Sequence, residues 1–248
     1  MNENFARVET KYMLCTDQMP EIEDALEAHG FHRMDFGNSL IQSLYYDTPD
    51  YLLIRQSLER PGFKEKLRLR VYGEASSLSS AFLEMKRKYK GVVYKRRTML
   101  PLRTAMNMPD TLEMPETAGQ IGKEIIWMMK RYRPVPAVVI RCDREQWVHS
   151  DDPGFRITFD RNIRFRNRNF DLRAKEYHIP LTDAGQRLME IKTGSAMPQW
   201  LARVLWETGA RHVHYSKYGL AYQRIIQDQR SIERGERACS TVSLPMGA

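Results

Sequence analysis

The stretch KEKLRLRVYG, residues 64–73, decides the fold because cations and apolar side chains alternate along it. The cations stand at every second position: Lys64, Lys66, Arg68 and Arg70. Leucine or valine fills the intervening positions from residue 67 onward. Successive side chains of a β-strand point to opposite faces of the sheet. The stretch therefore predicts a strand with one face packed on a core and the other carrying a row of four cations.

The length and composition predict one globular unit. A chain of 248 residues with 42% hydrophobic content can bury a full core in one large domain or two small ones. No linker rich in proline, glycine or serine divides it, so we expect a single domain over residues 1–230. Residues 231–248 show no periodic pattern and are expected to form a loosely ordered tail.

The charge balance points to an anionic partner, because 39 Lys and Arg against 31 Asp and Glu leave a net charge of +8. Nucleic acid, a membrane surface and a phosphorylated small molecule all fit this charge. No apolar stretch of about eighteen residues is present to cross a bilayer, and the N-terminus lacks a secretion signal. We therefore expect a cytoplasmic protein without a membrane segment. The three cysteines have no metal-type spacing and are expected to be reduced.

Strand signals outnumber helix signals in the first two thirds of the chain. Segments rich in β-branched or aromatic residues and bounded by turn residues are predicted strands. They span residues 6–14, 39–48, 64–73, 81–89, 92–100, 137–148, 155–165 and 187–194. Apolar stripes, prolines and capping residues predict helices elsewhere. These helices span residues 20–30, 119–132, 198–209 and 216–230.

The alternation of charge recurs in six further strands. Their polar faces carry Arg7, Glu9 and Lys11; Glu84, Lys86 and Lys88; Lys95 and Arg97; Cys142 and Arg144; Arg156, Thr158 and Asp160; and Glu190 and Lys192. For any one strand a solvated face is the better explanation, because lysine and glutamate there prevent edge aggregation. The six together favour an antiparallel barrel with the charges inside. Such a lumen must stay wet and receive a polyanion, because unpaired buried cations are costly.

An ordered series of short motifs carries a family resemblance. The motifs are R-x-E-x-K-Y at 7–12, Y-Y-D-T at 45–48, L-R-L-R at 67–70, L-E-M-K at 83–86, Y-K-R-R at 94–97, D-R-E at 143–145, R-I-T-F-D at 156–160, M-E-I-K at 189–192 and S-K-Y at 216–218. The sequence resembles the VTC domain, the polyphosphate polymerase domain of the vacuolar transporter chaperone complex. That domain lies within the CYTH-like, triphosphate tunnel metalloenzyme superfamily. Arg7 stands where the wider superfamily often has glutamate, which favours the VTC branch.

The resemblance implies an α+β protein whose antiparallel β-barrel forms a basic tunnel, with peripheral helices. The positions carried over as catalytic are Lys11, Arg68, Arg70, Lys86, Arg144 and Lys217. Those carried over as substrate-binding are Lys95, Arg97, Arg156 and Lys192. The metal-binding carboxylate corresponds to Glu190, with Glu9 and Glu84 as helpers. Cys142 stands where the VTC pattern usually has an aromatic residue.

The implied activity is metal-dependent transfer of the ATP γ-phosphoryl group to a polyphosphate chain inside the tunnel. Carboxylate ligands suit Mn²⁺ or Mg²⁺ as the divalent metal. The alternative in the same fold is an inorganic or nucleoside triphosphatase. An alternative of another class is a non-catalytic module that binds polyphosphate or nucleic acid. Nucleic acid is not expected as a partner, because the cations alternate with carboxylates rather than with stacking aromatics. A membrane-protein partner stays open.

Overall fold

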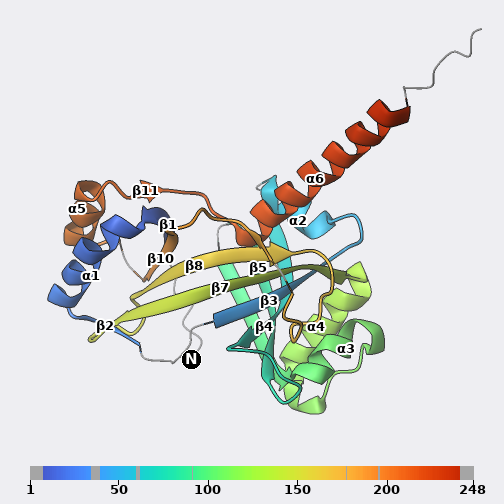
Figure 1. Ribbon diagram of the computed structural model, residues 1–248. Helices are drawn as coiled ribbons and strands as arrows, with labels where there is room; N and C mark the ends of the chain where they lie inside the picture. The colour runs from blue at the N-terminus through green and yellow to red at the C-terminus, as the bar shows by residue number, and fades with distance from the viewer. Residues whose placement is uncertain are drawn as a thin grey trace, which may run out of the picture.

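One antiparallel sheet of eleven strands organises the molecule (Figure 1). The computed structural model describes residues 8–34, 40–59, 62–90, 92–176, 178–194 and 196–240. The strands are β1 (Val8–Cys15), β2 (Phe31–Arg33), β3 (Leu40–Asp47), β4 (Phe63–Tyr72), β5 (Ser80–Tyr89), β6 (Val92–Pro101), β7 (Val135–His149), β8 (Arg156–Arg166), β9 (Ile179–Pro180), β10 (Gln186–Thr193) and β11 (Arg211–His212). Their order in the sheet is β11-β1-β10-β8-β7-β3-β4-β5-β6, with β2 paired to β7 and β9 to β8.

Helices connect and cover these strands. They are α1 (Met19–Ala28), α2 (Leu52–Leu58), α3 (Leu102–Thr111), α4 (Gly119–Tyr132), α5 (Gln199–Glu207) and α6 (Lys217–Ser240). Two short 3₁₀ helices, Thr16–Gln18 and Glu116–Ala118, precede α1 and α4. No described helix is long and apolar enough to span a membrane. The architecture is therefore α+β, as expected, with mostly antiparallel strands.

The predicted alternation along β4 is confirmed. Leu67, Leu69 and Val71 are completely buried, whereas the cations on the opposite side of the strand are half-buried. The other seven predicted strands also form, although residues 6, 7 and 39 of two of them lie outside the described chain. The short strands β2, β9 and β11 were not predicted, because two or three residues are too few for a periodic signal.

The predicted closed barrel is wrong, because the sheet is open. In the described chain β6 pairs only with β5. The free edge of β1 is taken by β11 and by the Val213 N–H, which donates to the Lys11 carbonyl at 2.9 Å. The middle of the β1 edge is therefore occupied, and in the described chain the sheet stays open between β11 and β6.

The open sheet still brings the polar faces of its distant strands together. The Lys66 ammonium of β4 donates to the Ser216 hydroxyl, just before α6, at 3.2 Å. Burial raises the pKa of Glu9 on β1, but the ammonium groups of Lys86 on β5 and of Lys11 outweigh it, so the pKa is lowered. The charged sides of β1 and of β4–β5 thus act on one shared space.

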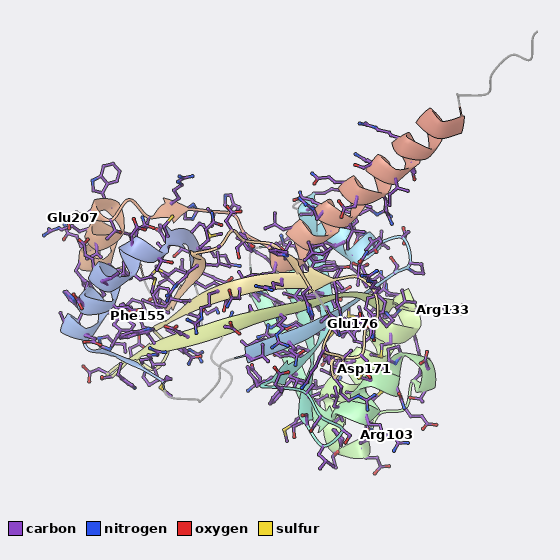
Figure 2. The ribbon with its side chains drawn as sticks, in the orientation of Figure 1. Arg103, Arg133, Phe155, Asp171, Glu176 and Glu207 are labelled. Carbon is purple, nitrogen blue, oxygen red and sulfur yellow. The ribbon has the colours of Figure 1, made fainter. Side chains whose placement is uncertain are left out.

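Apolar clusters lie on the opposite faces of these strands. At one end of the sheet the buried residues of β4 and β5 pack with α3 and α4. At the other end β8 and β10 pack with α1 and α5, in a cluster that includes Phe155 (Figures 1 and 2). Arg103 and Arg133 lie on the outer surface of the α3–α4 end (Figure 2). These four helices therefore hold the sheet from the side away from its charges, whereas α2 and α6 pack with Tyr45, Cys142 and Leu188 in a third apolar cluster beside the charged side chains.

All four predicted helices form. A serine was expected to cap the last of them, and the Ser216 hydroxyl accepts from the Gly219 N–H at 3.2 Å. This helix, α6, continues past residue 230 to Ser240 and projects from the body (Figure 1). Residues 231–240, expected to begin the irregular tail, are thus helical, and 241–248 lie outside the described residues.

Helix α2 was not predicted, and one buried aspartate explains its start. Both oxygens of Asp47 accept backbone N–H groups, from Thr48 and Leu53 at 2.8 Å and from Ile54 at 3.0 Å. The Tyr218 hydroxyl also donates to Asp47, at 2.7 Å. Asp47 therefore caps α2 and ties it to the first turn of α6.

We expect Asp47→Asn to lower the free energy of unfolding by about 2–4 kcal/mol, because buried donors lose a charged acceptor. Chemical denaturation followed by circular dichroism measures this change. The matched control is Asp50→Asn, an exposed carboxylate in the same loop, which should leave the denaturation midpoint almost unchanged. Equal midpoints for the two variants would contradict the capping role.

Candidate functional site

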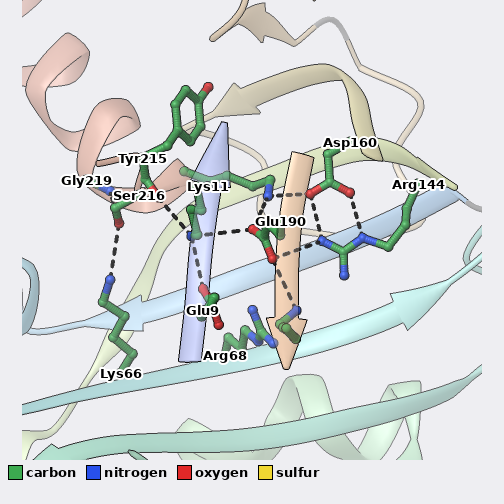
Figure 3. Close-up of polar contacts among 12 residues, drawn as sticks. Glu9, Lys11, Lys66, Arg68, Arg144, Asp160, Glu190, Tyr215, Ser216 and Gly219 are labelled. Carbon is green, nitrogen blue, oxygen red and sulfur yellow. Dashed lines mark hydrogen bonds and ion pairs between the residues drawn. The ribbon is translucent and has the colours of Figure 1, made fainter. Parts of the chain in front are cut away.

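The charged face gathers side chains from five strands and the start of α6 (Figure 3). β1 contributes Glu9 and Lys11, β10 contributes Glu190 and Lys192, β8 contributes Asp160, β7 contributes Arg144, β4 contributes Lys66 and Arg68, and α6 contributes Lys217. The strand period places them on one side, because each is separated from the next along its strand by one inward-packed residue. The structure thus brings together most of the residues predicted from the sequence.

Glu190 lies at the centre of this cluster. Its Oε1 atom is 3.4 Å from the Lys11 ammonium and 3.2 Å from that of Lys217. Its Oε2 atom is 3.2 Å from Lys192 and 4.0 Å from the Arg144 guanidinium. Burial raises the pKa of Glu190, but these cations, Lys217 foremost, outweigh it and hold the pKa well below its usual range. Glu190 is therefore ionised at neutral pH.

A second buried carboxylate, Asp160, was not predicted as a site residue. The Arg144 guanidinium donates to both of its oxygens, at 2.6 and 2.7 Å. The Lys217 ammonium lies 2.5 Å from Oδ2. Burial raises the pKa of Asp160, but Lys217 and then Arg144 outweigh it and lower the pKa to about 2. The alternation along its strand had placed Asp160 on the charged face, but only the contacts with Arg144 and Lys217 show that it pairs with two cations.

Glu84 organises the cations of β4 and β6. Arg68 Nε contacts one of its oxygens at 2.5 Å, and the Lys95 ammonium contacts the other at 2.6 Å. Burial would raise the pKa of Glu84, yet Arg68 and Lys95 lower it to about 2. Arg70 instead donates to the Ser43 hydroxyl at 3.1 Å. The carboxylate thus holds two of the predicted phosphate-binding cations at fixed positions.

Tyr45 and Lys66 also belong to this surface, and neither was predicted as a site residue. The Tyr45 hydroxyl accepts from Arg68 Nη1 at 3.4 Å, and its ring stacks on Tyr218 with centroids 4.7 Å apart. Burial raises the pKa of Tyr45, but Arg68, Arg70 and Lys66 lower it to about 8. Burial lowers the pKa of Lys66 to about 8. Both pKa shifts reflect a cluster of cations in a partly buried region.

Four predicted cations lie outside the ion-pair network of the described chain: Arg70, which bonds Ser43, and Lys86, Arg97 and Arg156. Lys86 acts on Glu9 through space. The Arg97 guanidinium lies over the Phe82 ring, 5.0 Å from its centroid. Arg156 Nε is buried and has no hydrogen-bond partner among the described residues. Arg7, at the start of the first motif, lies outside the described residues.

The carboxylates suit a divalent metal in type. The Lys11 ammonium lies 3.3 Å from Glu9 and 3.4 Å from Glu190, so these two carboxylates flank one position. Glu84, predicted as a helper, is held instead by Arg68 and Lys95. The part of the chain that the structure describes has no group of three or more His, Cys, Asp or Glu placed to hold a metal. Mg²⁺ is commonly held by one or two carboxylates with phosphate oxygens completing its shell, and the donors fit that mode.

The lowered pKa of Glu84 predicts an acid-sensitive contribution to stability. Its carboxylate stabilises the fold fully above the unfolded pKa of about 4.3, and this contribution, on the order of 3 kcal/mol, is lost as the pH falls through about 2. We expect Glu84→Gln to be destabilised at pH 7 and to lose less stability between about pH 5 and pH 2 than the wild type. Urea denaturation across this pH range measures both effects. Glu74→Gln, an exposed control, should follow the wild-type curve.

A model of the VTC domain family matches residues 6–226, which is most of the chain. No curated protein matches the sequence.

Two solved structures share the fold. A protein from Vibrio parahaemolyticus, provisionally described as an adenylate cyclase, is 15% identical with a TM-score of 0.51, over 87% of this chain and 97% of its own. A protein from Bacillus halodurans with the same provisional description is 10% identical with a TM-score of 0.50, over 85% and 93%. At these identities the likeness establishes the fold alone. Given the extent of the family match, the chain belongs to the VTC domain family.

Proposed function

We propose that this protein transfers the γ-phosphoryl group of ATP to a polyphosphate chain with the help of a divalent metal, and that it acts in the cytoplasm. The observation that carries the proposal is the excess of cations around the buried carboxylates. Glu190, Asp160 and Glu84 are each shared by at least two cations. Arg70 and Lys66 add further charge beside them. Such a surface is matched by a ligand that carries several negative charges close together.

The cations can supply what phosphoryl transfer requires of a protein, which is positioning and charge neutralisation. Arginine forks can each bind two phosphate oxygens, and lysines act as compact point charges. Arg68, Arg70 and Arg144 would hold consecutive phosphates in register. Lys11 and Lys217, which approach the same oxygen of Glu190, would contact the transferring group and its neighbour.

The remaining predicted cations would extend the phosphate path. Lys86, Lys95 and Arg97 lie on the β5–β6 side, whereas Arg156 and Lys192 lie on the β8–β10 side. A divalent ion, Mg²⁺ or Mn²⁺, neutralises charge on phosphate oxygens when it is bound, and Glu190 with Glu9 would hold it. Arg156, whose buried Nε lacks a partner among the described residues, would gain one from a phosphate oxygen.

A triphosphatase is the second candidate, because the same cations and carboxylates would hold a triphosphate for attack by water. The two reactions differ only in the acceptor: a phosphate chain end for the polymerase and water for the hydrolase. The product of the reaction therefore separates them.

We expect the purified protein to make long phosphate chains from ATP with Mn²⁺, resolved on a gel beside a free-phosphate assay. Free phosphate without chains would replace the polymerase by the triphosphatase. If neither product forms but tripolyphosphate still raises the melting temperature of the protein, a binding module is favoured.

We expect Glu190→Gln to abolish turnover and to leave tripolyphosphate binding measurable by calorimetry, because the metal ligand is lost while the cations stay. The control is Glu207→Gln, an exposed residue at the end of α5 (Figure 2). Unchanged turnover in Glu190→Gln would remove this residue from the metal-binding role.

A further inference from the structure

We propose that Asp160 is a positioning residue, whose carboxylate binds the Arg144 guanidinium and the Lys217 ammonium into one rigid phosphate-binding unit. The inference rests on the proposed function and adds to it a residue that does not itself touch the phosphates. It gives different roles to the two buried carboxylates that share Arg144 and Lys217: Asp160 fixes these cations, and Glu190 is free to exchange its partners.

The contacts of Asp160 are saturated and rigid. Arg144 approaches it with two parallel hydrogen bonds, from Nε at 2.6 Å and from Nη2 at 2.7 Å, the geometry that gives an arginine pair its orientation. Lys217 approaches Oδ2 at 2.5 Å. The Asp160 side chain is 0% exposed, so water does not compete for these contacts. Arg144 and Asp160 also face each other directly in the β7–β8 ladder.

The contacts of Glu190 differ in kind. Its four cations lie 3.2 to 4.0 Å from its oxygens, and none of the four makes a bidentate contact with the Glu190 carboxylate. Longer charge contacts are weaker and easier to exchange for phosphate oxygens or a metal. Among the described residues, Arg144 and Lys217 would without Asp160 keep only their contacts with Glu190, and the two cations would repel each other. Asp160 therefore keeps Arg144 and Lys217 in position when Glu190 changes its partners.

Asp160 also leaves the unit able to bind an anion. The group of Asp160, Arg144 and Lys217 has one negative and two positive charges, so it keeps a net positive charge. An ion pair with a purely structural role would need only one cation for one carboxylate. Asp160 occupies Nε and Nη2 of Arg144, and no hydrogen bond in the described chain engages Nη1. That N–H group is left to donate to a phosphate oxygen.

The first test replaces the charge of Asp160 while keeping its size. We expect Asp160→Asn, per folded molecule, to lower kcat at least about tenfold with KM within about threefold, because the phosphates still bind but in a poorer geometry. A role in stability alone would lower the melting temperature and leave kcat per folded molecule unchanged, which would overturn the proposal. Asp143→Asn is the matched control, since its carboxylate accepts from Asn162 Nδ2 at 2.7 Å and touches neither cation.

A second variant keeps the proposal testable if Asp160→Asn does not fold. Arg144→Lys retains the charge but cannot form the two parallel hydrogen bonds to Asp160. We expect the same pattern, a fall in kcat with little change in KM. Wild-type kcat in this variant would show that the bidentate pair has no part in positioning.

A double-mutant cycle on binding separates this inference from the proposed function, because it needs no turnover. Calorimetry would measure the dissociation constant of tripolyphosphate for Arg144→Ala with and without Asp160→Asn. We expect Arg144→Ala alone to weaken binding at least about tenfold, because Asp160 is then left partly unpaired and repels phosphate. In the Asp160→Asn background the same change should cost less than about threefold. If the two substitutions have additive effects, or if the wild type does not bind tripolyphosphate, the proposed phosphate-binding unit is wrong. If tripolyphosphate binds and the two substitutions are coupled but no product forms, only the proposed transferase activity is wrong.

Discussion

The ion pairs of the charged face follow from one constraint, which is that cations brought together out of water need anions close by. The strands supply these anions themselves, as Glu84, Asp160 and Glu190. Each carboxylate stays ionised because its neighbouring cations outweigh the effect of burial. The carboxylates thus allow the protein to fold with many cations gathered on one face of its sheet, beside the apolar cluster of β3, β7 and α6, and with two further apolar clusters on the opposite face.

The period of the strands made much of this surface predictable. A cation at every second residue of β4 sufficed to assign Arg68 and Arg70 to one face, and the same spacing placed Lys86 and Lys192. Closure of the sheet could not be predicted in this way, because it depends on which edges remain free. The middle of the β1 edge is taken by Arg211 to Val213, about two hundred positions further along the chain, in a strand too short to give a periodic signal.

Residues that act through tertiary contacts escaped prediction for a related reason. Asp160 has the spacing of an ordinary strand residue, and its importance appears only where Arg144 and Lys217 meet it from a neighbouring strand and a helix. Asp47 likewise ends a predicted strand, and its backbone contacts start a helix too short for a periodic signal. The alternation of residues along a strand shows which face of the sheet a side chain occupies, but it does not show which side chains from other strands and helices contact it.

The first turn of helix α6 joins the site to the buried body of the protein. Lys217 is the first residue of the helix, and Tyr218 anchors the same turn to Tyr45 and Asp47. The helix of 24 residues is about 36 Å long, and its outer turns project from the body (Figure 1). The Tyr218 contacts thus fix the turn that carries Lys217, and this sets where the Lys217 ammonium meets Asp160 and Glu190.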